Sequence, residues 1–272
     1  CKTMGSIYIP KDVKSIGEKA LYNCAGHLII DANQPDYDYA RSPFHNSQFK
    51  KVTFGDNIEI VGANFMTDCL KLKEVVLGKN LKSLSESAFF RSEYITTVEI
   101  KSDLKVEYNP FYACPDLISF VGNNTTEDSR CWIVDGVLMA FARKDITEYT
   151  MPEYVKQIGN YAFRNSKLQK VTLPEGLTRI GITAFGAASL QSITIPSSVT
   201  EIGDYAFSST RQLVSVVIPD SVTNIGEWAF SSCTSLTSVN ITDIAAWCNI
   251  DFDDYDSNPL DYAGNLYLNG EL

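Results

Sequence analysis

The sequence has no long apolar run, little histidine and no excess of positive charge. Its longest uninterrupted apolar stretch, residues 137–142, has six residues, whereas a membrane-spanning helix needs about 20. The sequence therefore predicts no membrane span. The 23 Lys and Arg are outnumbered by 33 Asp and Glu, and the net charge of -10 would repel a phosphate backbone. We therefore expect no nucleic-acid partner.

Residue patterns typical of catalysis and metal binding are also scarce. His27 and His45 are the only histidines, and neither lies in a nucleophile or zinc motif such as G-x-S-x-G or H-E-x-x-H. The seven cysteines include no C-x-x-C pair, which zinc sites commonly use. Carboxylates are plentiful, but a catalytic acid and base need a pocket. The sequence thus predicts a protein that is not an enzyme, with no catalytic residue, no cofactor and no metal ligand.

What the sequence does contain is an internal repeat. Residues 168–189 read LQKVTLPEGLTRIGITAFGAAS, residues 190–212 read LQSITIPSSVTEIGDYAFSSTRQ, and residues 213–235 read LVSVVIPDSVTNIGEWAFSSCTS. One proline and one glycine recur with spacings of 22, 22 and 23 residues: Pro152, Pro174, Pro196 and Pro219, and Gly159, Gly181, Gly203 and Gly226. Such a fixed period is the signature of a repeat architecture.

Each repeat position has a physical reason. In V-x-I the two apolar residues point to one face of an extended strand and the residue between them points to the other. The following proline has no N–H for a strand ladder, so it ends the strand. The later Ile-Gly and Ala-Phe bring further apolar groups inward, and the glycine allows either a close approach or a positive φ. We expect the recurring phenylalanines to stack as an internal spine: Phe163, Phe185, Phe207 and Phe230.

This unit resembles the BspA-like leucine-rich repeats, a bacterial class with a unit of about 23 residues, and the resemblance covers nearly the whole chain. It implies a repeat solenoid of the α/β leucine-rich-repeat type, with short parallel strands on one face and short helical or irregular turns on the other. About eleven units, with one hairpin insertion, fill the chain. We expect residues 1–272 to form a single solenoid that is a fragment of a longer array.

Four cysteines share one repeat position, three residues after the aromatic position: Cys24, Cys69, Cys114 and Cys233. Other units have Ser, Ala or Thr there, which predicts a small buried slot and reduced thiols. Cys1 falls in the same slot, so the chain begins within a repeat. A disulfide between Cys1 and Cys24, or a lipid-modified Cys1, are the alternatives. The C-terminal NLYLNGEL predicts a new strand with Leu266 and Leu268 as its inward pair.

Three stretches depart from the repeat and contain the candidate partner-binding residues. Residues 31–49 carry Tyr37, Tyr39 and His45 before Pro43-Phe44 restores the repeat. Residues 121–145 contain Trp132 and the dipeptide Asp135-Gly136, which is a strong signal for a two-residue hairpin turn. For Trp132, packing against the coil is the favoured interpretation.

The third stretch, residues 243–262, predicts a short amphipathic helix with Trp247 and then an acidic run. Tyr255 and Tyr262 are its candidate binding residues. The run of acids over 251–256 suggests calcium, but it lacks the glycine and distal glutamate of an EF-hand loop. A solvated acidic loop is therefore the favoured interpretation.

The outward strand positions are mostly neutral and β-branched: Tyr8, Thr53, Val76, Glu99, Thr150, Thr172, Thr194, Val217 and Asn240. This composition fits an ordinary sheet face or a shallow protein-binding face. Because core residues of a solenoid are occupied with stacking, function lies on the outer face or in insertions.

The resemblance implies a secreted or bacterial cell-surface protein, with its signal or anchor outside residues 1–272, that recognises protein partners such as host extracellular-matrix or cell-surface proteins. Its mechanism would be extended contact with a few aromatic anchors. Two alternatives are a structural spacer that displays another domain and a surface that captures glycans. The sequence leaves the oligomeric state open.

Overall fold

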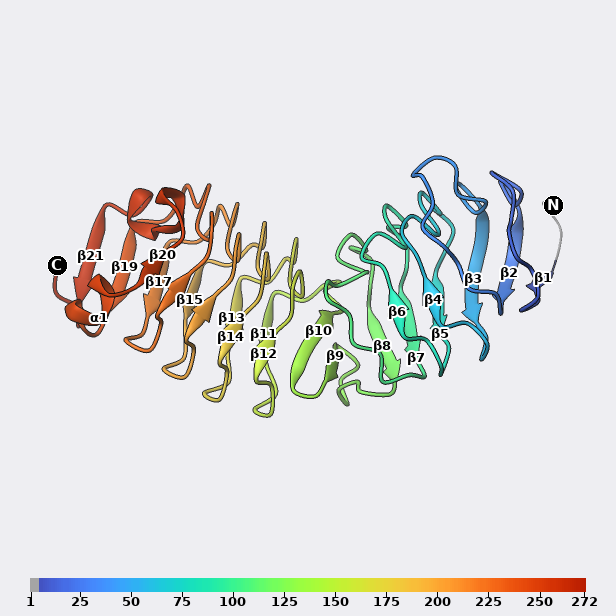
Figure 1. Ribbon diagram of the computed structural model, residues 1–272. Coiled ribbons are helices and arrows are strands. Elements are labelled where there is room, and N and C mark those ends of the chain that lie inside the picture. The colour runs from blue at the N-terminus through green and yellow to red at the C-terminus, as the bar shows by residue number, and fades with distance from the viewer. Residues whose placement is uncertain (1–4) are drawn as a thin grey trace. The chain divides into compact units, whose positions relative to one another are not determined.

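The structure, a computed structural model, describes residues 5–272, and Cys1 lies outside the described residues. The chain divides into two compact units, Cys1–Val134 and Asp135–Leu272. In each unit, successive coils stack so that strands one repeat apart are neighbours (Figure 1). The predicted solenoid of about eleven turns is confirmed. Among the described residues, no helix has the length and apolar character to cross a bilayer.

The first unit is built on one parallel sheet, whose strands pair in register with the strand one repeat earlier. Its strands are β1 (Ser6–Ile9), β2 (Ala25–Ile30), β3 (Gln48–Phe54), β5 (Glu74–Leu77), β7 (Thr97–Ile100) and β8 (Ser119–Gly122). A second, shorter ladder pairs β4 (Ile60–Val61) with β6 (Ser83–Leu84), and the unit ends with β9 (Cys131–Val134).

The second unit has strands on two faces of its coils. One face contains β11 (Glu148–Thr150), β13 (Lys170–Thr172), β15 (Ser192–Thr194), β17 (Ser215–Ile218), β19 (Ser238–Ile241) and β21 (Asn265–Leu268). The other face contains β10 (Val137–Phe141), β12 (Gln157–Ile158), β14 (Arg179–Ile180), β16 (Glu201–Ile202), β18 (Asn224–Ile225) and β20 (Asp251–Phe252). The helices are α1 (Ile244–Cys248) and the 3-10 turns η1 (Tyr255–Ser257) and η2 (Pro259–Asp261).

The face opposite the main strands differs in one respect from the expectation of helical or irregular turns. It carries a parallel ladder of two-residue strands, because the repeat glycine lets the backbones of adjacent coils touch. The Gly181 N–H donates to the Ile158 carbonyl at 2.9 Å, and a Cβ on Gly181 would lie 2.7 Å from that same oxygen. The glycine therefore serves close approach, and a positive φ is not its role here.

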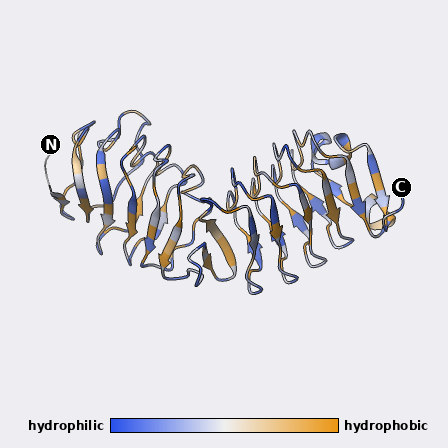
Figure 2. Ribbon diagram, turned by 180° about the vertical axis from the view of Figure 1, so that it is seen from behind, coloured by the Kyte–Doolittle hydropathy of each residue, from blue (hydrophilic) through white to orange (hydrophobic). Residues whose placement is uncertain are grey.

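The core is a spine of phenylalanines in successive coils, as predicted. In the second unit, Phe163 and Phe185 stack with centroids 5.0 Å apart, Phe185 and Phe207 are 5.3 Å apart, and Phe207 and Phe230 are 5.1 Å apart. All four side chains are almost fully buried. Figure 2 shows hydrophobic residues recurring along the strands of both units. The spine is stabilised by apolar burial and ring stacking.

The predicted cysteine slot is confirmed as small and buried. Cys24, Cys69, Cys114 and Cys233 are at most 3% exposed, and all four are reduced thiols. Burial raises the pKa of Cys69 to about 11 and that of Cys233 to about 12. Only Cys248, at the end of α1, is exposed among the described cysteines.

The turn between the two units has the conformation that its sequence predicts. Asp135 has φ 48° and Gly136 has φ 78°, and positive φ at both central residues is what a type I′ turn requires. β9 ends just before this turn and β10 begins just after it. β10 then pairs with β12 in parallel, so this strand is part of the repeating ladder of the second unit.

Four coils of the second unit also hold a residue in the left-handed region three positions after the second-ladder isoleucine: Tyr161 (φ 63°), Thr183 (φ 51°), Tyr205 (φ 55°) and Trp228 (φ 58°). None is glycine, and left-handed backbone costs about 1–2 kcal/mol for such residues. The stack holds this conformation in place, because the Thr183 N–H donates to the Asp204 carbonyl of the next coil at 2.8 Å.

A cavity in the phenylalanine spine should destabilise the protein strongly. Phe207→Ala is expected to lower the free energy of unfolding by about 3–5 kcal/mol, because it removes a buried ring that packs against two others. Urea unfolding followed by circular dichroism measures this loss. The exposed control Val214→Ala should change it by less than about 0.5 kcal/mol, and equal losses would contradict the stacked spine.

Relief of the left-handed strain should stabilise the protein. Thr183→Asn is expected to raise the free energy of unfolding by about 1 kcal/mol, because asparagine tolerates positive φ better than a β-branched residue does. The matched control is Thr172→Asn on the extended strand β13, where asparagine is disfavoured. Thermal unfolding of both variants tests this, and a stabilisation in the control alone would be incompatible with strain at Thr183.

Thiol accessibility tests the buried slot directly. Iodoacetamide at about pH 8 should alkylate Cys248 in the folded protein, because its side chain is accessible. Mass spectrometry of the digested protein should find five cysteines unmodified until denaturant is added: Cys24, Cys69, Cys114, Cys131 and Cys233. Rapid labelling of any of these five in the folded state would rule out the close stacking of coils described above.

Candidate functional site

Residues 31–49 form the first irregular stretch, which we call the long coil. Its candidate residues make hydrogen bonds to neighbouring coils. The Tyr39 hydroxyl donates to Asp68 Oδ2 at 2.5 Å, and Arg91 Nη1 donates to the Tyr39 oxygen at 3.2 Å. Burial and the hydrogen bond to Asp68 raise the pKa of Tyr39. Arg91 Nε also lies 3.2 Å from Asp68 Oδ1. These three side chains join three successive coils of the first unit.

Tyr37 and His45 are less accessible than Tyr39. Tyr37 is half-buried, its hydroxyl donates to Gln34 Oε1 at 3.0 Å, and burial raises its pKa to about 12. His45 is buried, and its Nδ1 shares a hydrogen bond of 2.9 Å with Thr67 Oγ1. The structure therefore assigns both side chains to holding the long coil in place, and of the three predicted residues only Tyr39 is exposed.

Trp132 offers no surface to a partner. Its side chain is 0% exposed and packs against Phe120 with ring centroids 6.3 Å apart. All four residues of β9 are buried. This burial supports the interpretation of Trp132 as a packing residue.

The third irregular stretch contains the most exposed candidate. Tyr255 is 81% exposed, whereas Tyr262 is half-buried at the end of η2. The predicted helix is present as α1, capped by Asp243 and burying Trp247. Tyr255 opens η1, which follows directly after Asp254. This places its ring on the outside of the last full coil.

The acidic run is engaged with protein donors. Asp254 Oδ1 accepts from the Trp228 N–H at 3.2 Å and also from the Ser257 hydroxyl, and Asp253 Oδ1 accepts from Asn224 Nδ2 at 3.2 Å. Among residues 5–272, no three His, Cys, Asp or Glu side chains are grouped as metal ligands would be. These contacts serve to attach the acidic loop to the preceding coil.

Tyr255 follows its second-ladder residue by three positions, the same offset as three aromatics that were not predicted as site residues. Ile158, Ile180, Ile202, Ile225 and Phe252 pair one after another across the second ladder. Three residues further along each coil stand Tyr161, Thr183, Tyr205, Trp228 and Tyr255. We call the four aromatic members of this row the aromatic column. The row lies on the outside of the coils, just beyond the second ladder.

The aromatic column is exposed and regular at its C-terminal end. Tyr205 is 41% exposed and Trp228 is 42% exposed, and their rings are nearly parallel at 7° with centroids 6.4 Å apart. Arg164 lies over the ring of Tyr161, 4.8 Å from its centroid. A signal for the column is present in the sequence, because aromatic residues stand between Gly and Ala-Phe in three of the repeats.

Negative charge gathers around the same coils. Residues 201–272 contain eleven Asp and Glu but only one basic residue, Arg211. Because the whole chain has a net charge of -10, residues 1–200 are neutral overall. Burial, with the nearby charges of Asp256 and Asp254, raises the pKa of Asp261. The C-terminal end of the aromatic column therefore lies in a region where carboxylates greatly outnumber basic side chains.

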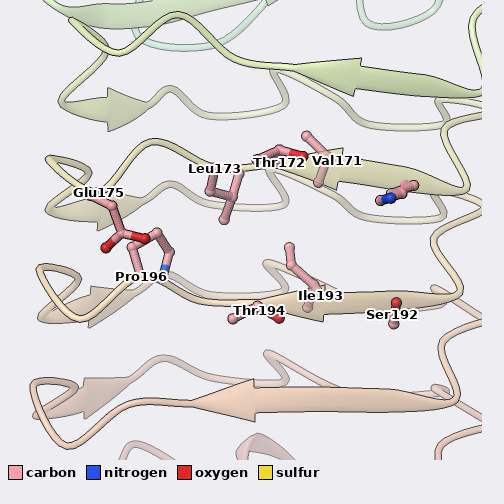
Figure 3. A pocket seen from close by; sticks show the side chains of 9 residues that line it. Val171, Thr172, Leu173, Glu175, Ser192, Ile193, Thr194 and Pro196 are labelled. Atoms are coloured by element: carbon pink, nitrogen blue, oxygen red, sulfur yellow. The ribbon is translucent and has the colours of Figure 1, made fainter.

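The main strand face of the second unit has a shallow groove. β13 pairs with β11, and β15 pairs with β17, but β13 and β15 belong to different sheets. A shallow groove of about 270 Å³ lies at this interruption, and Figure 3 shows its lining side chains on the two strands. Its ionisable lining residues are Lys170 and Glu175, both exposed. Nothing in this lining forms an acid–base pair.

The outward strand positions carry few anchors. Most are exposed or half-exposed as predicted, but Val76 is 4% exposed and so belongs to the core. Among these positions the one large aromatic is Tyr8, which is 58% exposed and donates a hydrogen bond to Asp31 Oδ2 at 3.0 Å. The aromatic column is therefore the surface with the most regular set of exposed rings among the described residues.

Several solved structures are similar to this chain. A leucine-rich repeat protein of Eubacterium ventriosum has a TM-score of 0.56 at 18% identity, over 81% of this chain and 67% of that one. A leucine-rich cell surface protein of Faecalibacterium prausnitzii has a TM-score of 0.45 at 18% identity, over 92% and 91%. A leucine-rich repeat protein of Bacteroides ovatus has a TM-score of 0.41 at 20% identity, over 93% and 84%. The first of these shows the shared fold.

The repeat itself also has a matching sequence profile. No curated protein matches the chain significantly. The profile of the BspA type leucine rich repeat region matches in six copies over residues 1–118 and 138–252, which is most of the chain and includes both units. The chain therefore belongs to the BspA-type leucine-rich repeat family.

Proposed function

We propose that this chain is a non-enzymatic recognition module that binds a protein partner on the outer surface of its coils, chiefly through the aromatic column. The observation that carries the proposal is the row of exposed rings in one register, Tyr205, Trp228 and Tyr255. Tyrosine and tryptophan are the residues that dominate binding energy at protein interfaces. Their recurrence lets several modest contacts act together over successive coils.

The proposal also covers where the protein is located and which class of partner it binds. The family resemblance supports a secreted or cell-surface protein, and extracellular partners such as host matrix or cell-surface proteins fit such a place. A spacer role would need no exposed aromatic row, so the aromatic column favours recognition over the spacer. The absence of a paired acid and base in the groove between β13 and β15 fits a module that binds without catalysis.

Binding to matrix proteins tests this proposal. Surface plasmon resonance of the full chain against purified host extracellular-matrix proteins should give saturable binding to at least one of them. Trp228→Asn, which suits the positive φ, should weaken that binding by at least about tenfold, because it removes a central anchor. Circular dichroism should find the variant folded.

The matched control is Tyr94→Asn, because Tyr94 is an aromatic residue of similar exposure, 43%, in the first unit. This control should leave binding unchanged. Saturable binding to none of the matrix proteins would refute matrix adhesion, and equal losses in Trp228→Asn and Tyr94→Asn would refute the role of the aromatic column.

A further inference from the structure

We infer that the C-terminal end of the aromatic column binds an extended segment of its partner in which Lys or Arg alternates with other residues. This inference rests on the proposed function and names the chemistry of the partner. Three observations carry it: the acid before each ring, the lack of cations around the rings, and the spacing of the rings.

The first observation is that each exposed ring follows an acidic residue directly. The pairs are Asp204-Tyr205, Glu227-Trp228 and Asp254-Tyr255, and the strand register aligns all three. The two earlier coils have no such acid, since Asn160 and Ile182 occupy the corresponding positions. The combination of a ring and a carboxylate is therefore specific to the last three coils of the ladder.

The second observation is how these carboxylates are held. Asp204 Oδ1 accepts from the Glu227 N–H at 3.0 Å, and Asp254 Oδ1 accepts from the Trp228 N–H at 3.2 Å. Both carboxylates are thus held by neutral donors of the chain, and Asp254 also accepts from the Ser257 hydroxyl. Glu227 is exposed. Within the described residues none of the three has a basic partner, whereas Glu201 in the same region is paired with Arg179 at 2.9 Å.

A cation is the ligand that both groups attract. Lys and Arg interact favourably with the faces of Trp and Tyr, and a carboxylate next to the ring adds a charge-assisted hydrogen bond. Arg164 over the ring of Tyr161, within the same column, shows this cation–π contact inside the chain. The three C-terminal rings have the carboxylates in place of such an internal cation.

The third observation is the spacing. The rings of Tyr205 and Trp228 are 6.4 Å apart, and alternate side chains on one face of an extended peptide are roughly 7 Å apart. A peptide that runs past these two rings in extended form can therefore place one of two alternate side chains at each ring.

A defined peptide tests the inference. The probe is a fluorescein-labelled peptide of alternating Arg and Ser with four Arg, and fluorescence anisotropy measures its binding to the full chain. Binding should be saturable and should weaken by at least about tenfold in Trp228→Asn. Glu227→Gln should also weaken it, and Tyr94→Asn should not. Raising the salt concentration from about 0.05 M to about 0.5 M should weaken binding further, because the charges are exposed.

Two control ligands separate the alternatives. The same peptide with Gln in place of Arg should not bind, and neither should an uncharged glucose hexasaccharide. Absence of binding by the Arg peptide would overturn the inference, and so would an Arg-peptide affinity that Trp228→Asn leaves unchanged. Binding of the hexasaccharide with no effect of salt would assign the rings to glycan stacking instead.

These experiments distinguish a failure of the basic-segment inference from a failure of the proposed function. If a matrix protein binds the chain and the Arg peptide does not compete with it, the inference of a basic segment is wrong. The proposed function, recognition of a protein partner, is then still supported. If the Arg peptide binds through the aromatic column and no matrix protein binds, the proposal of matrix adhesion is wrong. The inference that the column binds a basic segment is then still supported.

Discussion

The direct contact between backbones of adjacent coils is the constraint on which the rest of this structure depends. In the second unit the N–H groups of Gly181, Gly203 and Gly226 each donate to a carbonyl of the preceding coil at 2.8–2.9 Å. A Cβ on Gly226 would lie 2.6 Å from the backbone nitrogen of Asp204. At these three positions a side chain would collide with the preceding coil, so glycine lets the coils approach and pair in a single register.

Because the coils pair in one register, equivalent repeat positions form continuous rows on the surface and in the core. Once the second-ladder residues of five coils are paired, every position at a fixed distance from them also lines up, whether it points inward or outward. Inward positions become the phenylalanine spine and the buried cysteine slot. Outward positions become rows of side chains at the spacing of the coils, so a row of like residues gives a partner the same contact several times.

The inward features could be predicted from the sequence because the core restricts each position to a few residue types. The Phe and Cys positions kept the same offset from the repeat glycine, so counting residues located them. The second ladder was not predicted, since two-residue strands have no periodicity to detect. The contacts of Tyr39 were also out of reach, because they join residues of three coils, Tyr39, Asp68 and Arg91.

The candidate site was only partly predictable for a different reason. Tyr255 was predicted as a candidate binding residue, but its shared offset with Trp228 depends on the pairing of Phe252 with Ile225. The insertion of α1 makes this last coil longer than the others, so a fixed repeat length places Tyr255 out of register. Trp132 looked equally suitable by residue type, and only its burial separates it from the exposed rings.

The distribution of charge separates the coils before residue 200 from the coils after it. Residues 1–200 are neutral overall, and their coils place Asn64, Tyr161 and Thr183 at the left-handed position after the second ladder. The coils after residue 200 place Tyr and Trp at the same kind of position and surround them with carboxylates that have little internal compensation. Like charges that crowd together destabilise a compact state, and left-handed aromatics add to that cost. The phenylalanine spine beneath them, with stacked rings from Phe163 to Phe230, provides the stability that lets the C-terminal coils retain both features.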